Sequence, residues 1–542
     1  MRTILVMCIL VVALAGQAAA PPRGAARLRE LAVFPKMNLG FHSGFKFGNY
    51  QCVVEEDTDS SDQISQLQVE LKRQPDDIDR LLRLGRMLGD DGQTNESQSC
   101  YQKAEKLCEN KVAENSRNGF YLINLGAAQG GLNRDVEAEI TFRKAVLVSS
   151  NQWQSWTSLG NFLVSQSSTF LFPENLRRQA VPSGQAPSAA ILGCRPSADA
   201  LKKSMAYCHE ASVCFDRAMS LAPTEPQVYL QRAGYISMSN WQSCFYQYFR
   251  DNQAITSQQW LSAYVSDEMV ASLQKAADFS PKDYQLIGMA AYFKYTKAVA
   301  LSPSQANVAP LTLRALPGPA RQVVEQAMTH LEDLSRDPDK RTAAGASEYL
   351  GLLNMVFGNQ PAAAENCRRA VTLDPSLNGA WDMLLANLLN SAPGDELASL
   401  CESRLKYQDS ARNHLLLAKM YAQKAHKFKE AADQARIAAT LETNNIVTPL
   451  ILAAIALKDS VDTNALVNAY TELTRASALI SRSPPNDDSG ERWRECLLDQ
   501  AILEGLVGTS EDQNDARDLI DKVLRQYPDD PDAMNIREAL VN

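Results

Sequence analysis

Small and large side chains recur at fixed spacings along much of the chain. From Gly85, a small residue follows at +12, a large residue at +16 and a small residue at +19, namely Ser97, Tyr101 and Ala104. The same offsets recur from Gly126 (Ala138, Phe142, Ala145) and from Gly351 (Ala363, Cys367, Ala370). Two helices can approach closely where glycine and alanine meet, while the large residue fills the space between neighbouring units. The pattern therefore predicts a tandem array of helical hairpins.

An aromatic residue opens the next unit at a constant distance. Trp156, Tyr229 and Trp381 each stand six residues after the position where the preceding second helix should end. Proline occupies that position at 223 and 375, and proline cannot continue a helix. The spacing predicts that successive hairpins are joined directly to one another.

This motif resembles the tetratricopeptide repeat, a helical hairpin of about 34 residues. The resemblance covers most of the chain and is sharpest at 75–225 and 340–440. It implies an all-α fold, a right-handed α-solenoid of about eight to nine hairpins over residues 75–540. In this family the ligand lies in the concave groove lined by the first helices. On that basis the partner-binding positions are Arg86, Asn124, Asn161 and Gln231.

The repeat spacing is interrupted in two neighbouring units. The small residue expected at +12 from Gly160 is found only at Ala211, and the unit that contains Ala233 resumes its pattern at Ala276. We therefore expect two insertions, at 166–205 and 240–265, in the turns between first and second helices. Those turns lie along one edge of a solenoid.

The second insertion is rich in aromatic residues, although such residues make up only 7% of the chain. Trp241, Tyr246, Tyr248 and Trp260 are its candidate binding residues. One interpretation is a local hydrophobic core in which the rings cover each other. The other is a surface that binds a peptide or sugar rings through flat apolar faces.

Cysteines lie near both insertions. We expect a disulfide between Cys244 and either Cys194 or Cys208, which would join the two insertions. Cys367 and Cys401 instead occupy large-residue packing positions of their repeats. They are predicted to be buried thiols.

The N-terminus has the pattern of an export signal. Arg2 precedes an apolar run from Ile4 to Ala15, and Ala18 and Ala20 occupy the two positions that signal peptidase reads. The run is shorter than the roughly 20 residues that span a bilayer. We expect a signal peptide at 1–20, export to a periplasm or out of the cell, and no integral membrane span in the mature chain.

Residues 21–74 differ from the repeats, because glycine and aromatic residues alternate there before an acidic run. One interpretation is a flexible or extended leader. The other is an extended segment that docks on the solenoid or on a partner.

Composition and motifs argue against catalysis and against nucleic-acid binding. The chain has 63 acidic and 54 basic residues, a net charge of −9, whereas nucleic-acid binding needs clustered positive charge. It has five histidines and no GxxxxGK[ST], GxSxG or HExxH motif. We expect no catalytic residue, no cofactor and no metal.

These observations favour an exported, non-enzymatic scaffold that binds a protein or peptide through its concave groove and an aromatic edge insertion. The alternative is a glycan-binding protein that uses the aromatic insertion.

Overall fold

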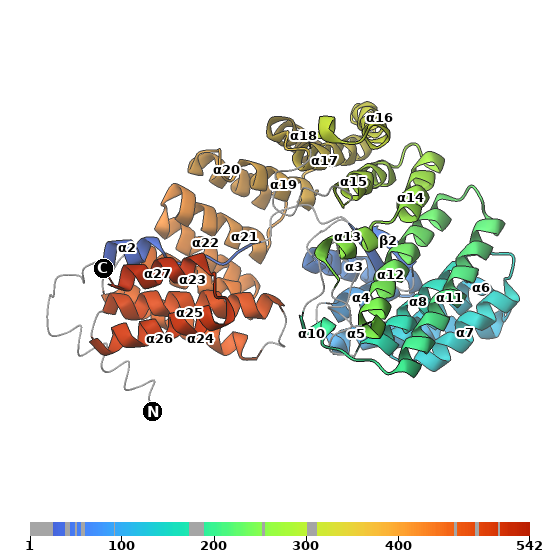
Figure 1. Ribbon diagram of the computed structural model, residues 1–542, viewed down its shortest axis with the longest axis horizontal. Helices are drawn as coiled ribbons and strands as arrows, with labels where there is room; N and C mark the ends of the chain where they lie inside the picture. Colours follow the sequence, from blue (N-terminus) through green and yellow to red (C-terminus); the bar gives the residue numbers. More distant parts are fainter. Residues whose placement is uncertain are drawn as a thin grey trace. The chain divides into compact units, whose positions relative to one another are not determined.

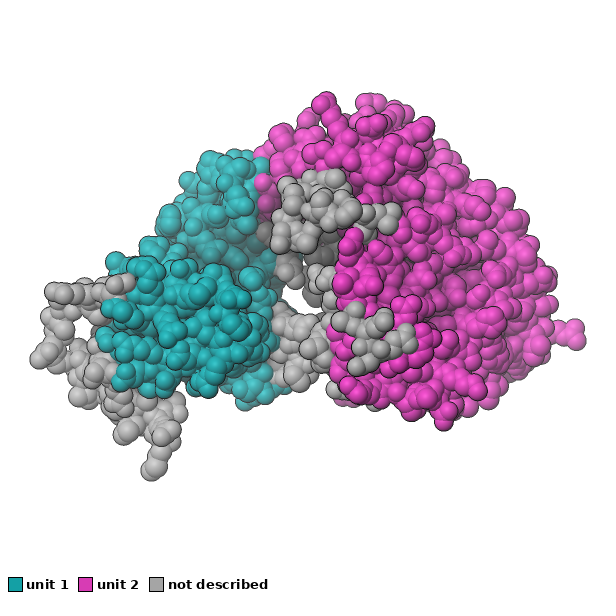
Figure 2. All heavy atoms as spheres, in the orientation of Figure 1, with its two compact units in different colours: residues 1–39, 388–542 teal, residues 40–387 magenta. Residues whose placement is uncertain are grey.

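The computed structural model (Figure 1) describes residues 25–37, 44–48, 51–55, 60–90, 93–172, 189–251, 255–300, 312–459, 463–482, 487–507 and 510–541. The signal-peptide prediction for 1–20 lies outside these residues. The chain divides into two compact units (Figure 2): unit 1 is residues 1–39 with 388–542, and unit 2 is residues 40–387.

Unit 2 begins with a β-hairpin and continues as consecutive helices. Its elements are β1 (Gly44–Gly48), β2 (Gln51–Glu55), α3 (Ser60–Arg73), α4 (Ile78–Asp90), α5 (Thr94–Glu114), α6 (Gly119–Gly131), α7 (Asp135–Val148), α8 (Trp153–Leu171), α10 (Ala189–Leu192), α11 (Ala198–Leu221), α12 (Pro226–Asp251), α13 (Ser257–Tyr264), α14 (Asp267–Phe279), α15 (Tyr284–Ala300), the 3-10 turn η1 (Leu313–Ala315), α16 (Gly318–Leu334), α17 (Lys340–Val356), α18 (Gln360–Leu373) and α19 (Asn378–Leu388).

Unit 1 combines an N-terminal segment with the C-terminal helices. Its elements are α2 (Ala25–Glu30), α20 (Gly394–Leu405), α21 (Ala411–Met420), the π-helical turn η2 (Tyr421–Ala425), α22 (Phe428–Leu441), α23 (Val447–Asp459), α24 (Thr463–Ile480), α25 (Asp487–Val507), α26 (Ser510–Gln526) and α27 (Pro531–Val541).

Neighbouring helices pair as hairpins in both units. The pairs are α4–α5, α6–α7, α8–α11, α12–α14, α15–α16, α17–α18, α21–α22, α23–α24 and α25–α26. The predicted all-α solenoid of about eight to nine hairpins is confirmed. The two short strands, paired antiparallel from Gly44 with Glu55 to Gly48 with Gln51, are the exception among the described residues.

The close helix approach depends on the positions that the repeat spacing selected. A Cβ placed on Gly85 would lie 3.2 Å from the Tyr101 ring, and one on Gly126 would lie 3.0 Å from the Phe142 ring. In the third unit a Cβ on Gly160 would lie 2.9 Å from Phe215. The missing side chain therefore makes room for the large residue of the second helix, even where the insertion separates the two in sequence.

In three hairpins the first helix is followed by a residue with a left-handed backbone. Asn133 (φ 59°) and Gly358 (φ 74°) each stand seven residues after the packing glycine of their unit, and the turn then leads into the second helix. This conformation ends a helix and suits glycine and asparagine. His426 (φ 55°) follows the π-helical turn η2 in the same place of its hairpin.

The aromatic residues near the start of α8, α12 and α19 make the same contact. Trp156 donates to the Ser150 carbonyl at 2.9 Å, and Trp381 donates to the Pro375 carbonyl at 3.0 Å. The Tyr229 hydroxyl donates to the Pro223 carbonyl at 2.8 Å. Each bond satisfies a carbonyl group just beyond the preceding helix, so the six-residue spacing has a structural reason.

Much of the two predicted insertions is helix rather than edge loop. α8, α11 and α12 contain 19, 24 and 26 residues, whereas α6 and α7 contain 13 and 14. Residues 198–205 begin α11, and residues 240–251 complete α12. The added residues therefore lengthen the helices of these two hairpins, and residues 173–188 lie outside the described part.

Ala145 tests the packing at these positions. It is fully buried in α7, so Ala145→Trp should overpack the hairpin and lower the free energy of unfolding by about 1–3 kcal/mol or more. The control is Lys144→Trp, which places the same side chain on the exposed neighbouring position. Urea unfolding followed by circular dichroism would compare them, and equal losses of stability would contradict the assigned packing.

Candidate functional site

The four polar residues assigned to the concave groove of unit 2 contact their own chain. Asn161 of α8 donates to Gln231 of α12 at 2.7 Å, and both side chains are buried. Asn124 of α6 is buried and donates to Asp79 of α4 at 3.4 Å. Arg86 pairs with Asp90 one turn further along α4, at 3.6 Å. The structure brings Asn161 and Gln231 together as a contact between successive first helices.

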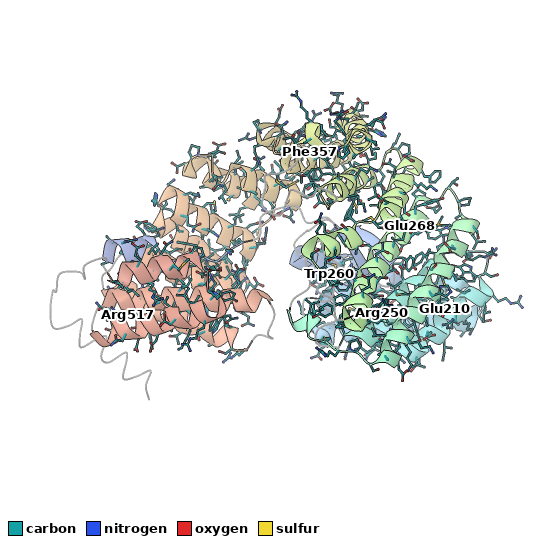
Figure 3. All side chains as sticks on the ribbon, viewed as in Figure 1. Glu210, Arg250, Trp260, Glu268, Phe357 and Arg517 are labelled. Carbon is teal, nitrogen blue, oxygen red and sulfur yellow. The ribbon has the colours of Figure 1, made fainter. Side chains whose placement is uncertain are left out.

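The aromatic residues of the second insertion form a core. Trp241 and Trp260 are each 1% exposed, and both rings pack on Phe245, with centroids 4.6 Å and 4.7 Å away. α13, which begins with a capping box of Thr256 and Gln259, carries Trp260 into this cluster (Figure 3). The assignment of Trp241 and Trp260 as partner-binding residues is therefore corrected, because their faces are covered by other side chains.

The two tyrosines of this region are half-buried. The Tyr246 hydroxyl lies 2.8 Å from the Ser204 Oγ, and burial raises the pKa of Tyr246. Tyr248 packs against the edge of Phe249, with centroids 5.4 Å apart. Both tyrosines therefore contact other side chains of this region.

The expected disulfide is not formed, because Cys244 is bonded to neither Cys194 nor Cys208. The Cys208 thiol donates to Gln242 Oε1 at 2.8 Å and belongs to a buried polar network. Cys244 is buried in the hydrophobic core of unit 2, where burial raises its pKa to about 11. Cys367 and Cys401 are buried, as predicted from their packing positions.

A different site lies in unit 1, where residues 25–37 cross a row of first helices. The short helix α2 packs against α23, α25 and α27, and the extended residues that follow it reach α21. These four helices are the first helices of successive hairpins, with α27 as the terminal helix. We call this surface the C-terminal groove and residues 25–37 the groove segment.

Apolar side chains anchor the groove segment. Leu28 and Ala32 are buried with Leu450, Leu457 and the apolar residues of α25. A Cβ on Gly505 would lie 2.5 Å from Leu540 and 3.1 Å from Leu28, so this glycine leaves room for both leucines. Phe34 is 6% exposed and lies in a second cluster, formed by Leu415, Ala418, Ala422, Ile451, Ala454 and Ile455.

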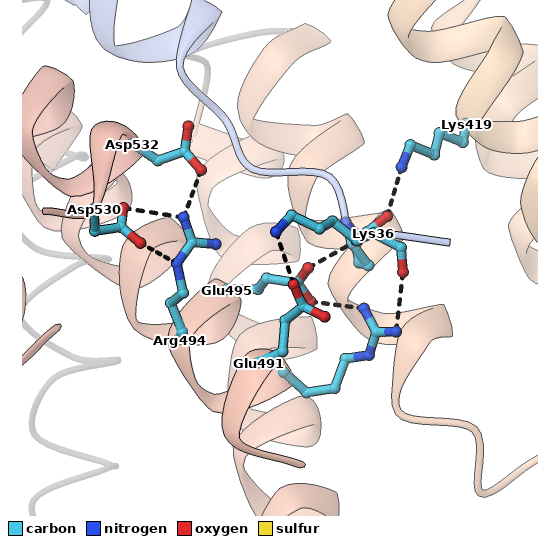
Figure 4. A network of polar contacts seen from close by, with 9 residues as sticks. Lys36, Lys419, Glu491, Arg494, Glu495, Asp530 and Asp532 are labelled. Carbon is cyan, nitrogen blue, oxygen red and sulfur yellow. Dashed lines mark hydrogen bonds and ion pairs between the residues drawn. The ribbon is translucent and has the colours of Figure 1, made fainter. Parts of the chain in front are cut away.

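The main chain of the groove segment is bound by charged side chains of the groove (Figure 4). The Val33 N–H donates to Asp499 at 2.7 Å, and the Lys36 N–H donates to Glu495 at 2.8 Å. Lys419 donates to the Pro35 carbonyl at 2.7 Å.

Arg492 completes this set from the same helix as the two carboxylates. It donates to the Lys36 carbonyl at 3.0 Å and to Glu495 at 2.9 Å. Backbone groups bonded in this way are satisfied as they would be in an additional strand or helix.

Ion pairs add to the apolar and main-chain contacts. Arg27 pairs with Glu538 at 3.1 Å, and Lys36 pairs with Glu491 at 3.0 Å. Arg29 donates to the carbonyls of Lys458 and Asp459, both at 2.7 Å. Those carbonyls end α23, where the helix dipole favours a cation. The exposed pairs contribute little by themselves, about 0–1 kcal/mol each.

The position of α25 is fixed by a second network. Arg494 pairs with Asp530, and it donates to Asp532 at 2.6 Å. Both partners lie at the start of α27, so the guanidinium joins successive first helices. Arg492, Glu495 and Asp499 are thereby held beside the groove segment.

Burial shifts the pKa values of the groups that bind the main chain. It raises the pKa of Asp499 well above its ordinary value, and it raises that of Glu495. It lowers the pKa of Lys419 to about 8, against an ordinary value of 10.5. The groove therefore binds the segment through charges that are costly to remove from water.

Sequence reasoning did not identify the C-terminal groove, although it named docking of the N-terminal region as one interpretation. A signal for the groove was present in α25, where Arg492, Glu495 and Asp499 are spaced as neighbours on one helical face. A charged face of this kind is ordinarily solvent-exposed. Only the position of residues 25–37, far away in sequence, shows that this face is buried.

Among the described residues, no helix is both long enough and apolar enough to cross a membrane. No cluster of three or more His, Cys, Asp or Glu residues in those ranges has an arrangement that could hold a metal ion.

No protein-family model and no curated protein matches the chain. Similar solved structures include yeast Tom70, with a TM-score of 0.33, 13% identity, and 89% of this chain and 92% of that chain covered. Another is the human IFIT1 dimer with m7Gppp-AAAA, with a TM-score of 0.34, 14% identity, and 90% and 95% covered. The APC/C hetero-tetramer Cut9-Hcn1 has a TM-score of 0.26, 13% identity, and 84% and 96% covered.

Scores this low carry no argument, so the assignment depends on the hairpins themselves. Gly85, Gly126 and Gly351 each face the large residue sixteen positions later, and three first helices open with the same aromatic-to-carbonyl bond. The chain is an α-solenoid of helical hairpins, and the positions at which its helices pack resemble those of tetratricopeptide repeats.

Proposed function

We propose that this protein is an exported, non-enzymatic scaffold whose C-terminal groove binds an extended segment of a partner protein. One observation carries the proposal: the groove already holds a peptide segment, residues 25–37, along its row of first helices. A surface that holds one extended segment in this way has the contacts needed to hold another.

The main-chain contacts support a peptide as the ligand. The groove bonds the N–H groups of Val33 and Lys36 and the carbonyls of Pro35 and Lys36. Every peptide has these groups, so the contacts fix its direction and register. The apolar pockets for Leu28 and Phe34 then select side chains.

The same contacts support a binding role rather than catalysis. Lys419, Arg492, Glu495 and Asp499 are all engaged by the groove segment. Their geometry is that of a clamp on main-chain atoms. Export is proposed from the apolar run and the alanine pair at the N-terminus.

The glycan-binding alternative has no structural observation in its favour. It required exposed rings at Trp241 and Trp260, and both rings lie in the core of unit 2. A protein partner in the C-terminal groove is therefore the proposal that we retain.

Site-specific photo-crosslinking tests the proposal. A photoreactive residue at Glu491, beside Lys36, should crosslink to an extended segment of a partner in the native exported fraction. The control is the same residue at Arg517, which is exposed on α26, a second helix. We expect at least about tenfold more crosslink from the groove position. Equal yields, or crosslinks from Arg517 alone, would place the partner elsewhere.

The buried Lys419 makes the stability of the folded protein depend on pH in a defined direction. Its pKa is about 8 in the folded protein, below the ordinary 10.5, so the unfolded chain binds the proton more tightly. Stability should therefore rise between these two values, by about 2 kcal/mol from pH 7 to about pH 9.5. Burial is the largest influence on this pKa, and the charges of four nearby groups also affect it: Glu495, Arg492, Glu491 and Lys36.

Urea unfolding at several pH values, compared with Lys419→Met, measures this contribution. The variant should lack the rise, whereas Lys429→Met, which removes an exposed lysine of α22, should keep it. A rise of the same size in Lys419→Met would assign the effect to other groups.

A further inference from the structure

Resting on the proposed function, we infer that the groove segment is an exchangeable occupant. It competes with a partner segment of the same chemistry: a basic stretch with one helical turn, then extended chain, anchored by a leucine and an aromatic residue. The residues that define this chemistry are those of the groove segment itself. They are Arg27, Leu28, Arg29, Ala32, Phe34, Pro35 and Lys36.

The groove segment is joined to its groove by contacts and not by local chain connectivity. Residues 25–37 precede unit 2, whereas the groove helices begin at Ala411, after unit 2. α2 has only six residues, and a helix that short is not stable alone in water. The order of the segment therefore depends on the groove, and a second segment can compete for the same contacts.

The Phe34 pocket selects an aromatic side chain. Its lining includes Ala418, Ala422 and Ala454, whose small side chains leave space for a ring between α21 and α23. Lys458 lies over the ring, with its Nζ 6.0 Å from the centroid, and this contact favours an aromatic over an aliphatic residue. Leu28 lies six residues earlier against α25, beside Gly505.

The charges of the groove favour a segment that is basic at both ends, while its single acidic residue, Glu30, pairs with Lys458 at 3.6 Å. Carboxylates stand at both ends, with Glu538 beside Arg27 and Glu491 beside Lys36. Between them, the carbonyls at the end of α23 accept from Arg29. An acidic segment would face like charges at these positions, whereas a basic one repeats the three contacts.

An empty groove would be costly, so exchange is the expected route for a partner. Asp499 and Glu495 are fully buried and accept main-chain N–H groups of the segment. Without those donors, each carboxylate would lose its bond while remaining partly desolvated. The groove segment therefore keeps the site filled until a competing segment takes its place.

Fluorescence anisotropy with a labelled peptide of residues 25–37 tests this exchange on the full chain. Phe34→Asp in the protein should release the groove segment, so the peptide should bind that variant about tenfold or more tighter than wild type. The matched control is Phe120→Asp, which changes an exposed phenylalanine of α6 and should bind like wild type. Circular dichroism checks that each variant is folded.

A second protein variant and two changed peptides complete the design. Arg29→Ala removes the bonds to the end of α23 without changing the apolar core, and it should increase peptide affinity by a smaller factor. A peptide with serine in place of Leu28 and Phe34, and one with glutamate in place of Arg29 and Lys36, should each bind Phe34→Asp about tenfold more weakly.

The outcomes separate this inference from the proposed function. If wild type and both variants bind the peptide with equal, high affinity, the groove accepts segments but residues 25–37 do not compete, and the inference is overturned alone. If no variant binds the peptide, or if binding to Phe34→Asp survives Asp499→Leu, the groove is not a peptide site and both proposals fail. Equal binding of the basic and glutamate peptides would overturn the stated partner chemistry.

Discussion

In several hairpins of this protein, two helices pack closely because a glycine lies opposite a large side chain. Gly85, Gly126 and Gly160 face Tyr101, Phe142 and Phe215 at distances that no Cβ could occupy without displacing the ring. This contact sets how closely the two helices of a hairpin approach each other. The spacing of the two helices in turn determines the surface on which the next hairpin packs. The buried core of each array follows from it, because a repeat is stabilised mainly by its neighbours.

Hairpins packed in this way can contain long insertions when the inserted residues extend their helices. α8, α11 and α12 are longer than α6 and α7 of the preceding hairpin, and the extra turns of α12 carry Trp241 and Phe245 inward. α13 then brings Trp260 onto the same cluster. Apolar area removed from water stabilises these turns, at roughly 25 cal/mol per Å². Aromatic density in a repeat protein is therefore weak evidence for a binding surface.

In unit 1 the first helices hold the groove segment as well as packing against one another. The first helices bind the main chain of the groove segment through four charged side chains: Lys419, Arg492, Glu495 and Asp499. Buried charges of this kind contribute little net stability, because their desolvation offsets their attraction. They do fix the direction and register of whatever peptide lies against them.

The sequence by itself determined the repeat architecture, because hairpin packing depends on residues at short, fixed offsets. Gly126 and Phe142 could be paired by counting, and so could Trp381 and Pro375. Only the tertiary structure decided what the polar and aromatic residues do. Asn161 meets Gln231, the Trp241 ring is covered, and Asp499 meets a backbone amide more than four hundred residues away. Such contacts leave no periodic trace in the sequence, because their partners are set by how separate parts of the chain come together.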